Sequence, residues 1–496
     1  MSAAWKQGFR VWLCVMVGFC LSCPLTAADG LYTVQADDGV ALKMRRYRPT
    51  EESVFRDGGQ PVVLFSGILT NMNEFLTHTP EERKDAYAGM TLPEPVADWA
   101  KNDPYIAADP MRYYSLAHYL WIKGYDPWLV NYRGTGRGEY KSERGSLMNT
   151  LDIWGIMDTA PCIEKVHEVT GIAPFIGGHS TGGFACHAYL QGATFDLAEL
   201  LAGYESGYLP HVKSDPLLAA ARNATIKGYI AIDPGLTPWL PEIIDQTFMW
   251  ALFGQPWYLD LDTFMDDVVN PYITSESLMP ATIELVCGTI QGLNAQYGQY
   301  LSLIPYLDIW YTSDTNPNTE DFFARYCASS TFIRQLGHWG DIGLHRSIRE
   351  FWKNGLENKD LLKGPEPDPG NDGYYYYDRH MNLISVPTIA VLSESDALVR
   401  SDDVIEFLMQ AKTPHPDDTY QIIPGTAHAD IPMGITAPTI TFPLIGAWLD
   451  EQMAVAAAAD AAPSSSTDTS SPKSENQGSS DDSDDGMCFI ITSLTT

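Results

Sequence analysis

The chain has 496 residues, of which 45% are hydrophobic and 19% are charged. This composition is that of a globular protein with a large buried core, and it excludes a chain that is disordered over most of its length. The formal net charge is −32, from 31 Lys and Arg against 63 Asp and Glu, which argues against nucleic acid and against an anionic membrane surface as the main partner.

Residues 1–28 have the layout of a secretory signal peptide. Two basic residues, Lys6 and Arg10, precede an apolar run from Val11 to Leu21, and small residues follow at positions 26–28. The apolar run is short for a membrane-spanning helix, and an uncleaved anchor is the alternative to a cleaved signal. We therefore expect a secreted or extracytoplasmic protein, in the periplasm or at the cell surface.

Short apolar runs alternate with stretches of helical length between residues 29 and 454, which predicts parallel βαβ units and an α/β sheet. Clusters of Gly, Asn, Ser or Asp follow these runs, and open α/β sheets place their chemistry at the carboxyl ends of strands. The predicted strands are Pro61–Phe65, Pro127–Val130, Phe175–Gly177, Ile226–Ile232, Pro387–Leu392 and Tyr420–Ile423.

The predicted catalytic core comes in two parts, residues 29–234 and 381–454. The interval 235–380 breaks the alternation and is rich in Trp, Tyr, Phe and Pro. We therefore expect an inserted cap that forms the wall of an apolar cleft above the sheet. The alternative is that these aromatic residues only form the cap's own core. Residues 455–496 form a predicted disordered, acidic and Ser-rich tail. Its apolar end, around Cys488, is either a sorting or anchoring segment for the envelope or a terminus without a role.

A G-x-S-x-G motif stands at residues 178–182, directly after a predicted strand and directly before a helical pattern at 184–190. A sharp strand-to-helix turn needs small residues on both sides so that the backbone can present the serine hydroxyl at a helix N-terminus. The motif therefore predicts that Ser180 is a nucleophile, and its alternative is an ordinary glycine-rich turn.

Serine is a poor nucleophile at neutral pH, so a histidine must accept its proton and an acid must orient that histidine. In the expected chain order the acid follows a late strand and the histidine follows the last one. These positions predict Asp396 and His428, with Asp233 as the alternative acid. The other histidines considered, for which structural hydrogen bonds are expected, are His179, His187, His338 and His345.

Two backbone amides should stabilise the oxyanion of an acyl-transfer intermediate. One is expected from Thr181, just after the nucleophile. The other should come from the loop after the strand at 61–65, where Ile68 is preferred and Leu69 is the alternative. Gly67 would let this loop turn.

The glycine-rich stretch at residues 133–138 lacks both G-x-G-x-x-G and G-K-[ST], so a structural turn with a salt-bridged Arg133 is expected rather than a nucleotide site. No cofactor and no metal are expected.

The chain resembles the acid lipase family, which includes the gastric and lysosomal acid lipases, over roughly residues 61–449. PVVLFSGILTNMNEF is similar to the family's strand and oxyanion loop, LAHYLWIKGYDPWLVNYRGTGRG to its GYDVWLGNSRG stretch, and GGHSTGG to its GHSQG elbow. YYYYDRHMNLISVPTIAVLSESDALV and GTAHADI match the family's acid and histidine segments, which the resemblance carries onto Asp396 and His428. This chain departs from the family's pattern at three places. It has Ser66-Gly67 where the family has His-Gly, Thr181 where the family has Gln, and Ala429-Asp430-Ile431 where the family has Leu-Asp-Phe. The cap matches weakly.

Together these features predict a secreted serine hydrolase that cleaves small-molecule or lipid carboxylic esters through an acyl-enzyme on Ser180. An acyltransferase or amide hydrolase would use the same three residues. A third alternative is a surface-displayed binding protein without catalytic activity. Such a protein would be expected to lack one of the three residues Ser180, Asp396 and His428.

Overall fold

The computed structural model describes residues 30–235, 256–270, 314, 316–345, 347–351, 374–396 and 398–461. The predicted signal peptide and nearly all of the predicted tail lie outside these residues, as do large parts of the predicted cap. The chain divides into two compact units, residues 1–452 and 453–496. Among the residues described by the structure, no helix combines the length and the apolarity that crossing a membrane demands.

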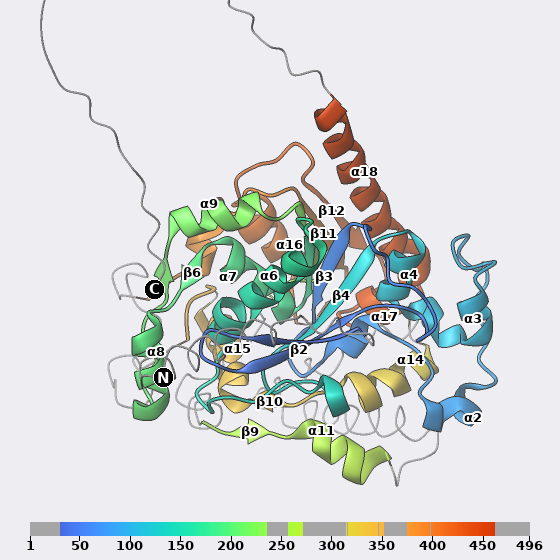
Figure 1. Cartoon of the computed structure of the whole chain (residues 1–496), viewed down its shortest axis with the longest axis horizontal. Helices are drawn as coiled ribbons and strands as arrows, with labels where there is room; N and C mark the ends of the chain where they lie inside the picture. The colour runs from blue at the N-terminus through green and yellow to red at the C-terminus, as the bar shows by residue number, and fades with distance from the viewer. Residues whose placement is uncertain are drawn as a thin grey trace, which may run out of the picture. The chain divides into compact units, whose positions relative to one another are not determined.

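The first unit is built on one sheet with the strand order β1-β2-β4-β3-β5-β8-β11-β12 (Figure 1). Strands from β4 to β12 run parallel, whereas β1 and β2 are antiparallel to their neighbours at one edge. The strands are β1 (Leu31–Gln35), β2 (Ala41–Arg46), β3 (Pro61–Phe65), β4 (Asp126–Asn131), β5 (Phe175–His179), β8 (Gly228–Ile232), β11 (Thr388–Ser393) and β12 (Thr419–Ile423).

Helices cover both faces of this sheet. Successive residues of a strand point to opposite faces, so Ile176 packs with α6 and α7 while its neighbour Phe175 meets Trp448 of α18. The α-helices are α2 (Lys84–Tyr87), α3 (Pro104–Ala108), α4 (Leu116–Ile122), α5 (Leu151–Ile153), α6 (Thr159–Thr170), α7 (Thr181–Leu190), α8 (Leu197–Ser206), α9 (Pro216–Ala224), α11 (Leu261–Phe264), α14 (Pro317–Phe322), α15 (Ile333–His345), α16 (Ser401–Val404), α17 (Asp430–Met433) and α18 (Phe442–Ala461).

The central strands are apolar because they are buried on both sides. Every residue of β3, β4, β5, β8 and β11 is buried, as expected for parallel strands under helices. This mostly parallel sheet with flanking helices is the α/β-hydrolase fold, and the predicted fold class is confirmed. The six predicted strands correspond to β3, β4, β5, β8, β11 and β12.

The parallel strands end in register at one edge of the sheet. Phe65 of β3 lies opposite Gly178 of β5, and Ile232 of β8 lies opposite both His179 of β5 and Val391 of β11. The loops that follow these strands therefore meet above this edge, and they are the loops in which the sequence predicts the chemistry.

The described parts of the interval 235–380 lie against the core. They include two short strands, β9 (Tyr258–Leu259) and β10 (Thr331–Phe332), which pair with each other. A second small pair, β6 (Ala193–Thr194) with β7 (Lys213–Ser214), belongs to the core segment. The apolar cleft predicted beneath the cap depends largely on segments outside the described residues.

Candidate active site

Ser180 stands on a strained turn between β5 and α7. Its φ is 54° and its ψ is −127°, a conformation that residues other than glycine rarely adopt. Neighbouring glycines allow the turn to close: a Cβ on Gly178 would lie 2.4 Å from the carbonyl carbon of Gly182, and one on Gly182 would lie 2.2 Å from the oxygen of Phe65. The G-x-S-x-G spacing is therefore a steric requirement of this turn, which aims the hydroxyl above the sheet edge.

His428 and Asp396 form a hydrogen-bonded pair in the loops after β12 and β11. The His428 Nδ1 lies 2.6 Å from Asp396 Oδ2, and the side chains of both residues are almost fully buried. The amides of Leu398 and Val399 donate to Asp396 Oδ1 at 2.6 and 3.0 Å, which fixes the carboxylate. A carboxylate on Nδ1 leaves the Nε2 lone pair of a neutral imidazole free to accept a proton.

Asp233, the alternative acid, lies in the same cluster but makes other bonds. One acceptor atom from each of Asp233, Asp396 and His428 lies within 4.8 Å of the others. The carboxylate of Asp233 accepts hydrogen bonds from the amide and the hydroxyl of Ser393 at 2.8 and 2.6 Å. Burial and the neighbouring Asp396 hold the pKa of Asp233 well above its ordinary value, so a neutral carboxylic acid is favoured here.

The same three side chains are, among the described residues, the group whose atoms could together hold a metal ion. His428 Nδ1 and Asp396 are already bonded to each other, so the geometry is that of an oriented base.

His179, which precedes Ser180 in the chain, contacts His428 directly. The rings of His179 and His428 lie with centroids 4.6 Å apart, and His179 Nε2 donates to the carbonyl oxygen of His428 at 3.1 Å. No hydrogen bond joins the hydroxyl of Ser180 to His428, both of which are described residues. In unliganded sites this bond is often long and tightens only when a substrate is bound.

The loop after β3 lies directly against the nucleophile. A Cβ on Gly67 would lie 2.9 Å from the Cβ of Ser180, so only glycine fits at this position. Ile68 and Leu69 follow in the same loop, and Leu69 has a left-handed φ of 61°. Thr181 is the first residue of α7, where the amides of a helix have no partner within the helix. The three residues expected to supply oxyanion donors thus flank Ser180 on two sides.

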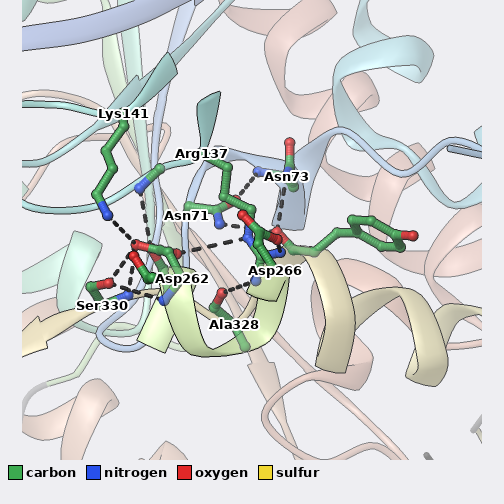
Figure 2. Close-up of polar contacts among 12 residues, drawn as sticks. Asn71, Asn73, Arg137, Lys141, Asp262, Asp266, Ala328 and Ser330 are labelled. Atoms are coloured by element: carbon green, nitrogen blue, oxygen red, sulfur yellow. Dashed lines mark hydrogen bonds and ion pairs between the residues drawn. The ribbon is translucent and has the colours of Figure 1, made fainter. Parts of the chain in front are cut away.

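Tyr326 and Ser329 of the cap interval are bonded to this loop and to the turn after it, where Asn71 and Asn73 lie (Figure 2). The backbone amide of Ser329 donates to the Leu69 oxygen at 2.8 Å. The side-chain Nδ2 groups of Asn71 and Asn73 both donate to the backbone oxygen of Tyr326. Because Leu69 is in the left-handed region, this bond to its carbonyl helps to hold an otherwise unfavourable conformation.

Arg137 fastens the same cap segment to the core (Figure 2). Its guanidinium donates to the Ala328 oxygen and pairs with Asp266, and it lies near the buried Asp262. Lys141 adds a bond to Asp260 at 3.2 Å. The cap segment is therefore held over the loop after β4 by charged groups, of which Arg137 and Asp262 are largely buried and the other three are partly exposed.

The residues expected to be structural occupy buried positions. Arg133 is fully buried and pairs with Asp38 and Asp158, as the sequence predicts for a structural turn. His187 bonds the hydroxyl of Tyr229, and burial lowers its pKa to about 3. His338 bonds the Arg349 carbonyl oxygen. The side chain of His345 lies outside the described residues.

The sequence did not single out Glu74. It is fully buried in the 3-10 turn Met72–Phe75 and lies 2.6 Å from His179 Nδ1. A single carboxylate in the stretch SGILTNMNEF gives no periodic or motif signal that distinguishes it from a loop surface residue.

Comparisons with known proteins find only distant likenesses. No protein-family model matches the chain, and a search of curated proteins finds no match. Solved structures similar to it include a thermophilic esterase from Thermogutta terrifontis (12% identity, 85% of this chain and 98% of that one, TM-score 0.37). Others are a monoacylglycerol lipase from Paleococcus ferrophilus (13%, 83% and 99%, TM-score 0.37) and an α/β-hydrolase fold protein from Chitinophaga pinensis (11%, 86% and 98%, TM-score 0.38). Likenesses of this size carry no argument about substrate, and the resemblance to acid lipases stays a prediction.

Proposed function

We propose that the chain is a serine hydrolase that cleaves carboxylic esters through an acyl-enzyme on Ser180. The observation that carries the proposal is the strained turn that presents Ser180 at the same sheet edge as the hydrogen-bonded pair of His428 and Asp396. A histidine held by a carboxylate is the base that a serine nucleophile requires.

In the proposed reaction the Ser180 Oγ attacks the ester carbonyl carbon while its proton passes to His428 Nε2. The amides of Thr181 and of Ile68 or Leu69 stabilise the oxyanion. The alcohol leaves with the proton held by His428, which gives the acyl-enzyme. Water then attacks the acyl carbon while His428 takes a proton from it. His428 returns this proton to Ser180 Oγ as the bond to the acyl group breaks, and the carboxylic acid is released. Asp396 orients His428 throughout and stabilises its charged form.

The substrate class is proposed to be a small-molecule or lipid ester. The support is the interval 235–380, whose described parts lie over the oxyanion loop, together with its content of aromatic residues. The test is hydrolysis of p-nitrophenyl esters of increasing chain length by the mature protein and by Ser180→Ala. Activity that rises with chain length and is lost in the variant supports a lipase, a short-chain preference supports a general esterase, and turnover equal to wild type in the variant contradicts the mechanism.

We propose further that the protein is exported through residues 1–28 and that the tail from residue 455 serves for attachment to the envelope. The support is the order of basic, apolar and small residues in the first segment and the composition of the second. N-terminal sequencing of extracellular or periplasmic protein would find a mature chain near residue 29. An intact C-terminus on freely soluble protein would contradict attachment.

A further inference from the structure

Both ring nitrogens of His179 face hydrogen-bond acceptors. The Nε2 lies 3.1 Å from the backbone oxygen of His428, and a carbonyl can only accept, so this nitrogen carries a hydrogen. The Nδ1 lies 2.6 Å from Glu74 Oε1. Burial lowers the pKa of His179, but Glu74 outweighs burial and the pKa is raised above its ordinary value. The geometry is therefore that of a protonated imidazole paired with a buried carboxylate.

Glu74 ties this pair to the oxyanion loop. Its Oε2 accepts from the hydroxyl of Thr70 at 2.5 Å and lies 3.4 Å from the Gly67 amide. The Thr70 hydroxyl is also 2.9 Å from the Gly67 oxygen. One buried network thus joins the loop after β3, the residue before the nucleophile and the backbone of the base, which are the three parts that must hold their places during catalysis.

The positive charge of His179 also lies beside the ring of His428, 4.6 Å between centroids. Acidic residues lie around the two rings. Glu74 bonds His179, Asp396 after β11 bonds His428, Asp233 after β8 lies in the same cluster, and Asp430 of α17 acts on Asp233. Asp233 is favoured as a neutral acid, and burial keeps the nearby Cys327 thiol neutral by raising its pKa. Among the described residues named here, His179 carries the positive charge, and it repels a second positive charge on His428.

We propose that Glu74 and His179 are positioning residues that hold the oxyanion loop and His428 in register, and that the positive charge of His179 beside the ring of His428 disfavours a second positive charge there. The inference rests on the proposed function of Ser180 and His428. It predicts that removing the charge of this pair weakens activity most on the acidic side of the pH profile.

The experiment measures the rate of labelling by a fluorophosphonate as a function of pH, since this reagent reports on the nucleophile, its base and the oxyanion donors and does not require a known substrate. His179→Gln removes the cation, and Glu74→Gln keeps the shape of the carboxylate but removes the charge that holds His179 protonated. For both variants we expect the rate at about pH 5, relative to its plateau, to fall roughly three- to tenfold below that of wild type. The matched control is His187→Gln, a buried histidine of α7 that contacts Tyr229, and its relative profile should not move.

The possible results separate the two proposals. Labelling of wild type and not of Ser180→Ala, with unchanged acidic profiles in folded His179→Gln and Glu74→Gln, would overturn the role of the pair alone. A wild type that is not labelled at any pH would overturn the proposed function and this inference with it. If His179→Gln does not fold, the profile of Glu74→Gln decides. A shift in His187→Gln as large as in the other variants would show that the effect is structural and would also overturn the proposal.

Discussion

His428 bonds the carboxylate of Asp396: its Nδ1 lies 2.6 Å from Asp396 Oδ2. Asp233, at the end of the neighbouring strand, shares the cluster but is bonded to Ser393. An aspartate thus stands at each of the two positions from which this fold can supply the acid. Their hydrogen bonds differ, because only Asp396 bonds the histidine.

The two acids should differ sharply when each is replaced by its amide. Asp396→Asn presents an amide to His428 and disfavours the tautomer that leaves Nε2 free, so kcat should fall roughly a thousand- to ten-thousandfold. Asp233→Asn keeps an acceptor for the Ser393 amide at a site where a neutral group is already favoured, so its kcat should stay within about threefold of wild type. Steady-state kinetics on one activated ester compares them, and the reverse order would assign the acid to Asp233.

The turn at the nucleophile should not tolerate a methyl group at Gly182. A Cβ there would lie 2.2 Å from the backbone oxygen of Phe65, which cannot move without disturbing β3. We expect Gly182→Ala to lower the free energy of unfolding by at least about 2 kcal/mol. Gly89→Ala, where a Cβ meets nothing within 4 Å, is the control and should unfold like wild type. Urea unfolding measures both, and equal stability of Gly182→Ala would contradict this geometry.

The contact between the cap and the core should depend on Arg137. Arg137→Ala leaves the buried Asp262 without this neighbour and the Ala328 oxygen without its donor, so we expect a loss of about 1 to 3 kcal/mol and a raised KM. Lys101→Ala removes an exposed pair with Asp98 and is the control, for which no measurable change is expected. Thermal unfolding and KM are the measurements. Wild-type values for both in Arg137→Ala would show that this cluster does not hold the cap.

Stability should depend on pH through Asp314. Burial raises its pKa from 3.8 to about 6, against the opposing effect of its hydrogen bonds from Thr436. The folded state therefore binds a proton more tightly than the unfolded state, and this contribution to stability is present at low pH and is lost as the pH rises toward about 6. Asp314→Asn should lose less stability than wild type between about pH 4 and about pH 6.5 in urea unfolding. Parallel pH profiles would contradict this assignment.

The central strands of the sheet could be predicted from the sequence because they are apolar and punctuated by small residues. The strands β1 and β2 were not predicted, since they are antiparallel to their neighbours and contain mixed polar and apolar residues. The β2 sequence ALKMRR even consists of good helix formers, and its pairing with β1 and β4 decides its conformation.

The candidate site could be predicted as far as local spacing reaches. The turn at Ser180 has a steric signature, and the loops after β11 and β12 supply Asp396 and His428 in the expected order. Two things depended on the three-dimensional structure. One is the choice between Asp396 and Asp233, which both follow parallel strands, and the other is the pairing of Glu74 with His179, 105 positions apart in the chain.

The most direct test of the account is to react the mature protein with a fluorophosphonate and to locate the adduct by peptide mass mapping. The account predicts one stoichiometric adduct on Ser180, absent from Ser180→Ala and greatly slowed in a variant without His428. Absence of any adduct on folded protein, or an adduct on another residue with Ser180 unmodified, would contradict it.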